Sequence, residues 1–192
     1  MGYSKGNAKL GSNIYTYSRL AGQTCPGASN YCASVCYAKK IQKRWPNVEQ
    51  AWGSNSVSNI VLYPPSKSKV IRMHVSGDFD SSAYIQEWVK VARAHPDKVF
   101  FGYTRSWKIP YLINWLELLR SLKNVQLFAS VDSSMSGQPP SGWRIAYIDN
   151  ITHTSSHVAT LKCPEQEGTK ASCQECKYCF VGRKGNVLFK EH

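Results

Sequence analysis

The chain has 192 residues, of which 42% are hydrophobic and 19% charged, and a formal net charge of +12. This length suits one core that buries roughly 70% of the unfolded surface, and this composition excludes disordered, collagen-like and coiled-coil proteins. No apolar run approaches the roughly 20 residues of a membrane-spanning helix, so we expect no membrane partner.

The first residues, Met1 to Gly6, lack the apolar stretch and cleavage site of a secretory signal. The sequence therefore predicts a protein of the cytoplasm. In that reducing compartment the seven cysteines are not expected to form disulfides, and an odd number would leave one unpaired. We interpret them as metal ligands or catalytic groups.

The predicted elements begin with a strand over 13–18, followed by a loop with Gly, Pro and three cysteines. A helix is expected from about 33 to 44. A second helical piece is expected over 48–62, before Pro64-Pro65 interrupts it.

Strand and helix patterns then alternate. They comprise strands over 70–75, 98–103 and 125–131, helices over 81–94 and 109–122, and short strands over 144–148 and 157–161. This alternation predicts an α/β fold with mostly parallel strands, arranged as a partial (β/α) barrel. We expect one domain over residues 1–192, with an α/β core over 13–161 and a cysteine-rich C-terminal segment over 162–192.

Polar side chains follow three of the predicted strands: Ser76-Gly77-Asp78, Arg105 and Asp132. Ligands of parallel α/β proteins bind at the carboxyl ends of strands, so these residues predict a polar site there. The Arg105 guanidinium can hold a carboxylate or phosphate with two hydrogen bonds, or it can pair with Asp78. The alternative is that these Ser and Asp side chains only cap helices and order turns.

His74, Ser76 and Asp78 also lie close enough in sequence to suggest an esterase-like hydrolase. Neighbouring strand residues point to opposite faces, however, and the chain has no Gly-x-Ser-x-Gly elbow. We interpret His74 as a neutral core histidine in preference to a proton shuttle or metal ligand.

The cysteines form two groups, Cys25, Cys32 and Cys36 near one end and Cys163, Cys173, Cys176 and Cys179 near the other. Clustered thiolates suit zinc or an iron–sulfur cluster. The Cys-x2-Cys-x2-Cys run has the spacing of bacterial ferredoxins, in which the remaining ligand precedes a proline, as Cys25 and Cys163 do. The two separate Cys-x2-Cys pairs of a zinc ribbon are missing, so a [4Fe–4S] cluster is favoured and zinc is the alternative.

Two ways of dividing the cysteines remain open. The first three can hold an iron site with one open position while the other four close a second site, or a single cluster can take four of the seven. An iron with three protein sulfurs can bind a substrate and act as a Lewis acid, whereas a closed cluster transfers electrons or stabilises the fold.

Four motifs follow one another along the chain: Cys25-Pro26-Gly27-Ala28 with Cys32 and Cys36-Tyr37-Ala38, then Ser76-Gly77-Asp78, then Tyr103-Thr104-Arg105, and last Cys163-Pro164 with the final three cysteines. Together, over about residues 13–180, they resemble the bacteriophage gene-product-eighty-eight family. The resemblance implies a phage-encoded protein of the host cytoplasm.

The layout is also similar to a shortened radical S-adenosylmethionine barrel, although the first cysteine loop has spacings of six and three residues in place of three and two. That likeness implies that the first three cysteines hold the cluster and that Ser76-Gly77-Asp78 binds S-adenosylmethionine, with Asp78 accepting from its amino group. Arg105 would receive a carboxylate. We therefore expect an enzyme for a small anionic substrate that uses radical or open-iron Lewis-acid chemistry, with Asp78 and Arg105 as catalytic residues.

A nucleic-acid-binding protein with a structural zinc or iron–sulfur centre is the other hypothesis. The net charge favours polyanions, and Lys39, Lys40, Lys43 and Arg44 form a compact basic cluster. Exposed aromatic side chains would then contact bases. The sequence contains no recognisable motif for a protein partner.

Overall fold

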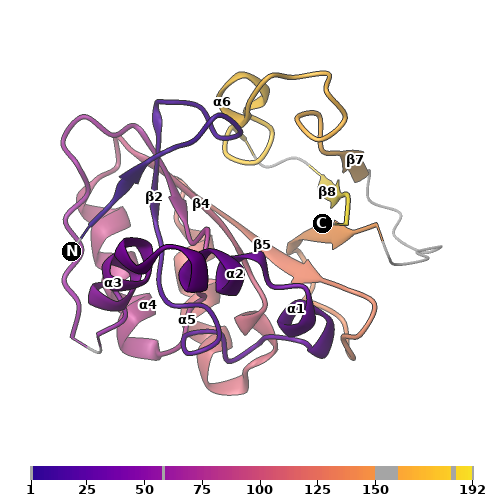
Figure 1. Ribbon diagram of the computed structural model, residues 1–192, viewed down its shortest axis with the longest axis horizontal. Coiled ribbons are helices and arrows are strands. Elements are labelled where there is room, and N and C mark those ends of the chain that lie inside the picture. Colours follow the sequence, from indigo (N-terminus) through magenta and orange to yellow (C-terminus); the bar gives the residue numbers. More distant parts are fainter. Residues whose placement is uncertain (1, 58, 150–159, 183–184, 192) are drawn as a thin grey trace.

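The structure is a computed structural model that describes residues 2–57, 59–149, 160–182 and 185–191. An eight-stranded sheet in the order β1-β2-β3-β4-β5-β6-β8-β7 forms its centre (Figure 1). The strands are β1 (Ser4–Lys5), β2 (Ile14–Tyr17), β3 (Val70–Met73), β4 (Val99–Thr104), β5 (Val125–Val131), β6 (Arg144–Ile148), β7 (Thr160–Lys162) and β8 (Asn186–Phe189).

All neighbouring strands pair in parallel except β1, which runs antiparallel to β2. The predicted α/β class with mostly parallel strands is therefore confirmed. The sheet is open, with β1 and β7 at its edges. Its likeness to part of a barrel stays a prediction.

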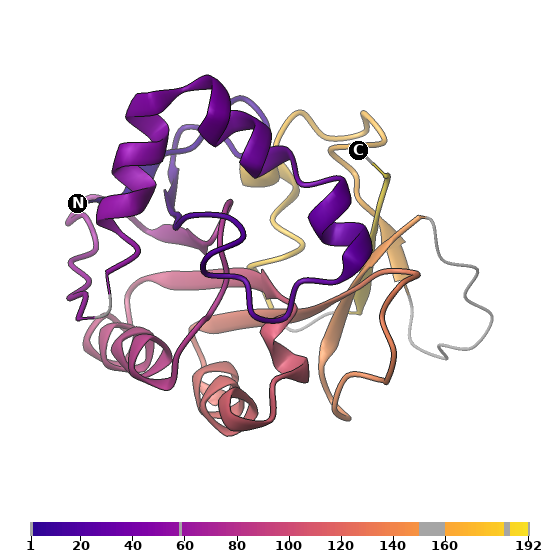
Figure 2. The same ribbon diagram turned by 60° about the horizontal axis from the view of Figure 1, so that its bottom comes forward.

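The helices are α1 (Asn30–Ser34), α2 (Tyr37–Arg44), α3 (Pro46–Ser54), α4 (Ser82–Ala94), the 3-10 turn η1 (Ser106–Lys108), α5 (Pro110–Ser121) and α6 (Cys173–Cys176). Figure 2 shows α4 and α5 on one side of the sheet and α1 to α3 on the other. None of the helices in the described ranges is long and apolar enough to cross a membrane.

Each strand supplies side chains to both faces, because successive residues of a strand point in opposite directions. Phe100 of β4 packs into the large core that α4 and α5 cover, where Trp88 and Leu116 are fully buried. The next residue, Phe101, packs on the opposite face against Phe180 of the C-terminal segment. The cysteine-rich segment therefore covers part of the sheet face opposite α4 and α5, the face on which α1 to α3 also lie.

Two helix predictions are wrong in extent. The helix expected over 33–44 is two helices, because the Ser29 side chain caps α1 early and Cys36 takes an extended conformation as the N-cap of α2. The piece expected over 48–62 ends at Ser54. The buried Asn55 side chain donates to the Ser18 carbonyl, which draws the chain away from the helix axis.

The C-terminal segment also contributes a strand that the sequence did not predict. Strand β8 lies between β6 and β7 and pairs in parallel with both. The strand predicted over 157–161 corresponds to β7 only in its last residues, since 157–159 lie outside the described residues.

Candidate functional site

The loop that carries the first three cysteines lies directly on the carboxyl ends of β3 and β4. Its Thr24 carbonyl accepts a hydrogen bond of 2.9 Å from the backbone N of Asp78. A Cβ on Gly27 would stand 2.2 Å from the carbonyl oxygen of Arg105, and a Cβ on Gly77 would stand 2.6 Å from the Thr24 hydroxyl. Glycine at these two positions lets the loop and the strand ends approach this closely.

Asp132, which follows β5, fixes the same loop from the other side. Its Oδ2 accepts from Ser29 Oγ (2.6 Å) and Arg105 Nε (3.1 Å), and its Oδ1 accepts from Ser134 Oγ (2.9 Å). Burial opposes its ionisation, but the Ser29 and Ser134 hydrogen bonds and the Arg105 charge lower its pKa below the usual value. Ser29 also accepts from the backbone N of Cys32, so Asp132 positions both the guanidinium and the helix that carries Cys32.

Arg105 pairs with Asp132, and the sequence-based alternative of a side-chain pair with Asp78 is wrong. Its backbone N, and not its guanidinium, donates to Asp78 Oδ2, at 2.8 Å. Its side chain is 17% exposed, and its two Nη groups make no hydrogen bond to any residue that the structure describes. Four N–H donors are thus left for an anion.

The buried carboxylate of Asp78 joins the ends of β3 and β4. Its Oδ1 accepts from Thr104 Oγ1 (2.6 Å) and from the backbone N of Phe79 (2.8 Å), and its Oδ2 accepts from Arg105. Burial raises its pKa, against the lowering effect of these hydrogen bonds. A carboxylate has about four acceptor positions, so roughly one is left for another donor. The role of Asp78 in cofactor binding and catalysis stays a prediction.

Ser76 and Gly77 are covered by the loop that follows β2. The backbone N of Arg19 donates to the Ser76 carbonyl (2.9 Å), and Ser76 Oγ lies 3.5 Å from Gln42 Oε1. Gly77 has a φ of +78° and lies against Arg19. The role of Ser76 and Gly77 in binding a cofactor stays a prediction.

The thiols of Cys25, Cys32 and Cys36 are partly buried and close enough to act on one another. Burial raises the pKa of Cys25 to about 12, and the charges of Asp78, Cys32 and Cys36 add to this. Burial also raises the pKa of Cys32. The charge of Arg105 lowers this pKa, and the charge of Cys36 raises it. The charges of the three thiols therefore influence one another, and Cys32 also responds to Arg105.

A second gathering of thiols forms around Tyr103, on the sheet face covered by the C-terminal segment. Cys163, Cys173 and Cys179 all belong to the apolar clusters of this face. Burial raises the pKa of Cys179 to about 11, although a hydrogen bond with Tyr103 lowers it, and Cys173 and Cys163 add to the rise. Cys176 lies at the other end of α6 from Cys173.

Arg72, which no sequence pattern singled out, lies on the Tyr103 ring beside the C-terminal thiol group. Its guanidinium lies 5.3 Å from the centre of the Tyr103 ring, and its charge acts on Cys173 and on Tyr37, the residue after Cys36. Its Nε is buried without a hydrogen-bond partner in the described structure, and it forms no ion pair there. The positive charge therefore acts on Cys173 of the C-terminal group and on Tyr37, the neighbour of Cys36.

Metal ligation by the seven cysteines stays a prediction. Within the ranges that the structure describes, no three Cys, His, Asp or Glu side chains are placed so that they could hold one metal ion. All seven cysteines are free thiols. What the structure establishes is the separation of the cysteines into two groups with different surroundings.

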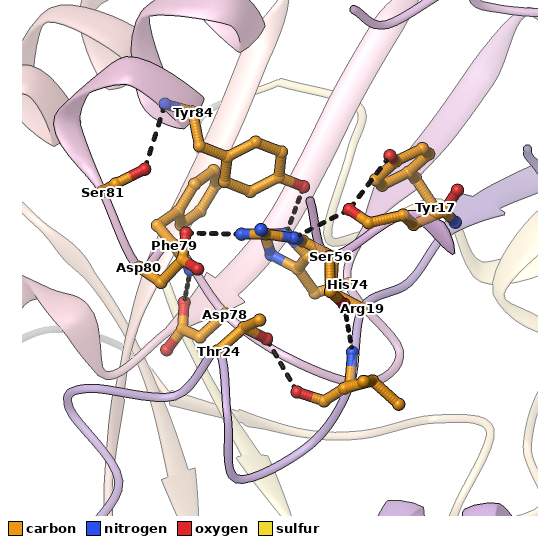
Figure 3. Close-up of polar contacts among 12 residues, drawn as sticks. Tyr17, Arg19, Thr24, Ser56, His74, Asp78, Phe79, Asp80, Ser81 and Tyr84 are labelled. Carbon is orange, nitrogen blue, oxygen red and sulfur yellow. Dashed lines mark hydrogen bonds and ion pairs between the residues drawn. The ribbon is translucent and has the colours of Figure 1, made fainter. Parts of the chain in front are cut away.

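Arg19 and His74 form a buried polar group beneath the site (Figure 3). Arg19, which is 1% exposed, pairs with Asp80 and lies 4.1 Å from the centre of the Tyr84 ring. His74 Nε2 lies 2.8 Å from the Tyr84 hydroxyl, and burial, with Arg19 and Arg72 adding, lowers the His74 pKa to about 3. His74 is thus a neutral core histidine, in the left-handed conformation with a φ of 65°.

The contacts do not assemble the esterase-like arrangement. His74 is hydrogen-bonded to Tyr84, Ser76 to Gln42 and Asp78 to Thr104.

A hollow of about 330 Å³ lies away from the strand-end site, and its lining is Gly2, Tyr3, Tyr17, Val57, Asn59, Ile60, Val61 and Tyr63.

Comparison with known proteins gives a family. A family model described as "Gene product 88" matches residues 1–182. The chain is 28% identical over 218 residues to the "Gene 88 protein" of Mycobacterium phage L5 and 28% identical over 222 residues to that of Mycobacterium phage D29. Each match covers 96% of this chain and 89% of the relative, and both relatives support a bacteriophage origin. No solved structure matches.

Proposed function

The chain belongs to the gene product 88 family, and on that premise we propose that it is an iron–sulfur protein whose substrate-binding cluster is held by Cys25, Cys32 and Cys36. The observation that carries the proposal is the position of the loop with these three cysteines, which lies on the strand ends and contacts Asp78 and Arg105. In parallel α/β proteins this edge of the sheet is where ligands bind.

The surroundings of the first three cysteines suit a cluster. Soft thiolates are the ligands that iron–sulfur clusters and zinc prefer, and the positive charge of Arg105 favours the thiolate form of Cys32. Because burial raises the pKa values of Cys25 and Cys32, these thiols carry protons in the metal-free protein. Metal binding would release those protons, which makes loading more favourable as pH rises.

The side chain of Arg105 is the substrate-binding group of the proposal. Asp132 holds its Nε, so the unused Nη donors have a fixed direction and bind a carboxylate or phosphate at little entropic cost. Asp78 offers its remaining acceptor position to an amino group of a substrate or of S-adenosylmethionine. A cluster with one open iron supplies either an electron for radical chemistry or a Lewis acid.

The two thiol groups favour the division of the cysteines into three and four. Asp78 and Arg105 act on the first group, whereas Tyr103 and Arg144 act on Cys179 in the second. A second cluster held by the C-terminal group, Cys163, Cys173, Cys176 and Cys179, would be closed by protein ligands. Such a cluster serves electron transfer or the stability of the fold.

Anaerobic purification followed by iron, sulfide and zinc analysis tests the proposal. We expect iron with acid-labile sulfide and a broad visible absorption. A Cys25→Ser protein should lose part of the iron, a Cys173→Ser protein should lose a different part, and the double variant should lose both. Circular dichroism controls for folding. A colourless protein with stoichiometric zinc would overturn the iron–sulfur assignment, and equal, non-additive losses would favour one shared cluster.

A further inference from the structure

Helix α2 presents four cations to solvent that have no role in the proposed site. The side chains of Lys39, Lys40, Lys43 and Arg44 are all exposed, and none forms an ion pair within the part of the chain that the structure describes. The surrounding sequence offers no local counter-charge, because residues 1–48 contain no Asp or Glu. We call these four side chains the basic face of α2.

The stability of α2 does not account for this charge. Lys43 and Arg44 lie in the last turn, where a cation interacts favourably with the helix dipole. Lys39 and Lys40, however, lie at the third and fourth helical positions, close to the positive end of the dipole. Cations there are unfavourable, and cations three or four residues apart repel one another. The basic face therefore costs stability.

An aromatic side chain continues the basic face. Trp45 directly follows α2 and is 51% exposed. The Arg44 guanidinium lies 5.5 Å from the centre of the Trp45 ring. A large apolar ring in water next to a row of cations is the combination with which proteins bind single-stranded nucleic acid, whose bases stack on aromatic rings while its phosphates contact Lys and Arg.

The opposite side of α2 is fixed to the protein, so the basic face is held in place. Ala38 is buried, and Gln42 Oε1 accepts a hydrogen bond of 2.7 Å from the backbone N of Ala21. Residues three or four apart on a helix have their Cβ atoms roughly 5–6 Å apart. The helix therefore presents two pairs of cations, one helical turn apart, to a partner that carries several negative charges.

We propose that the basic face of α2 and Trp45 bind single-stranded nucleic acid without sequence preference. The four cations contact phosphates and the indole ring stacks on a base. This surface acts independently of any cluster, although Cys36, the N-cap of α2, places it next to the candidate site. An acidic protein offers the same charge but no bases to stack, which the experiment below distinguishes.

Fluorescence anisotropy with a labelled oligothymidylate of about 12 nucleotides tests the proposal, since this length lies within the usual site sizes. Four phosphate contacts predict an affinity loss of about 50-fold when salt rises from about 50 to about 200 mM. Replacing all four cations of the basic face by Gln should abolish most of the binding and most of this salt dependence. No binding by the native protein at the lower salt concentration would overturn the proposal.

A charge-matched control separates this surface from the effect of net charge. Lys67, Lys90, Arg93 and Lys123 are exposed on other parts of the molecule, and replacing them by Gln removes the same number of charges. This control should bind the oligonucleotide within roughly threefold of the native protein. Equal losses in the two quadruple variants would show that only the net charge matters.

Trp45→Ala tests the single-strand assignment. We expect at least a roughly fivefold loss of affinity for the oligothymidylate and no change for a duplex of the same length. Because Trp45 is exposed, thermal unfolding by circular dichroism should be unaltered. Equal losses for both oligonucleotides, or binding of polyglutamate as tight as that of the oligothymidylate, would overturn the assignment.

Discussion

The Nε of Arg105 donates a hydrogen bond of 3.1 Å to the Oδ2 of Asp132, across the carboxyl ends of β4 and β5. The same carboxylate receives the hydroxyl of Ser29, so one acidic side chain joins two strand ends to the loop of the first three cysteines. The arrangement of the candidate site therefore depends on Asp132.

Replacing Asp132 should weaken both the fold and the site. In Asp132→Asn the charge is lost while the side-chain shape is kept, so the hydrogen bonds from Ser29 and Arg105 lose their charge assistance. We expect the free energy of unfolding, measured with urea, to fall by about 1–3 kcal/mol. Ser134→Ala, which removes one neutral donor from the same carboxylate and an exposed acceptor for the Tyr31 backbone N, should cost only about 1 kcal/mol. Equal effects of the two changes would contradict the central position of Asp132.

The sequence predicted the repeating part of this fold because apolar spacing and burial agree there. The strand over 125–131 and the helices over 81–94 and 109–122 are present within a residue or two of their predicted ends. The break before α2 was missed, since it depends on the N-cap of α1 and on the extended Cys36, which apolar spacing does not report. Strand β8 was missed because its partners lie far away in the chain.

The candidate site was predicted in its residue types and less well in its contacts. Local sequence placed Arg105 near Asp78, but the fold turns its guanidinium towards Asp132. Arg72 and Arg19 carry no sequence signal, because a single Arg in or after an apolar strand is typical of exposed surface. Only the packing of the two loops around them shows that these charges lie inside.

The stability of the protein should depend on pH because of His74. Burial lowers its pKa to about 3 in the folded protein, whereas an unfolded histidine titrates near 6.5. Between these two pH values the unfolded state binds one more proton than the folded state. The contribution of His74 to the free energy of unfolding is therefore fully present above pH 6.5, and it decreases by about 1.4 kcal/mol for each unit by which the pH is lowered.

The variant His74→Asn isolates this contribution. Asn tolerates the left-handed backbone at this position and does not titrate. Urea unfolding at several pH values between about 4 and 7 should show a slope smaller by about 1.4 kcal/mol per pH unit than that of the native protein. An unchanged slope would mean that His74 is protonated in the folded state.

Replacing Gly27 should remove the proposed metal site of the first three cysteines and leave the C-terminal site in place. A Cβ in Gly27→Ala would stand 2.2 Å from the Arg105 carbonyl oxygen, so the loop must move away from the strand ends. We expect a folded protein that has lost the iron assigned to the first three cysteines and kept that of the C-terminal group. Gly53→Ala is the matched control, since its Cβ would meet its nearest atom at an ordinary 3.8 Å. Full iron content in Gly27→Ala would contradict the location of the site.

The charge of Arg72 should affect the reduction potentials of the proposed clusters. Its charge reaches Cys173 on one side and Tyr37, next to Cys36, on the other. A reduced cluster carries one more negative charge, so a nearby cation stabilises it and raises its reduction potential. Arg72→Gln should therefore lower the potential, and Arg72→Lys should keep most of it.

A redox titration followed by electron paramagnetic resonance measures this effect for each cluster separately. The prediction concerns the shift and not the activity, so it holds whichever substrate is used. The apolar clusters of this sheet face pack Tyr103 against Cys179, and the Arg72 guanidinium lies on the same ring. The C-terminal cluster should consequently respond to Arg72→Gln. Potentials that do not move in the Gln variant would show that neither cluster forms beside this face of the sheet.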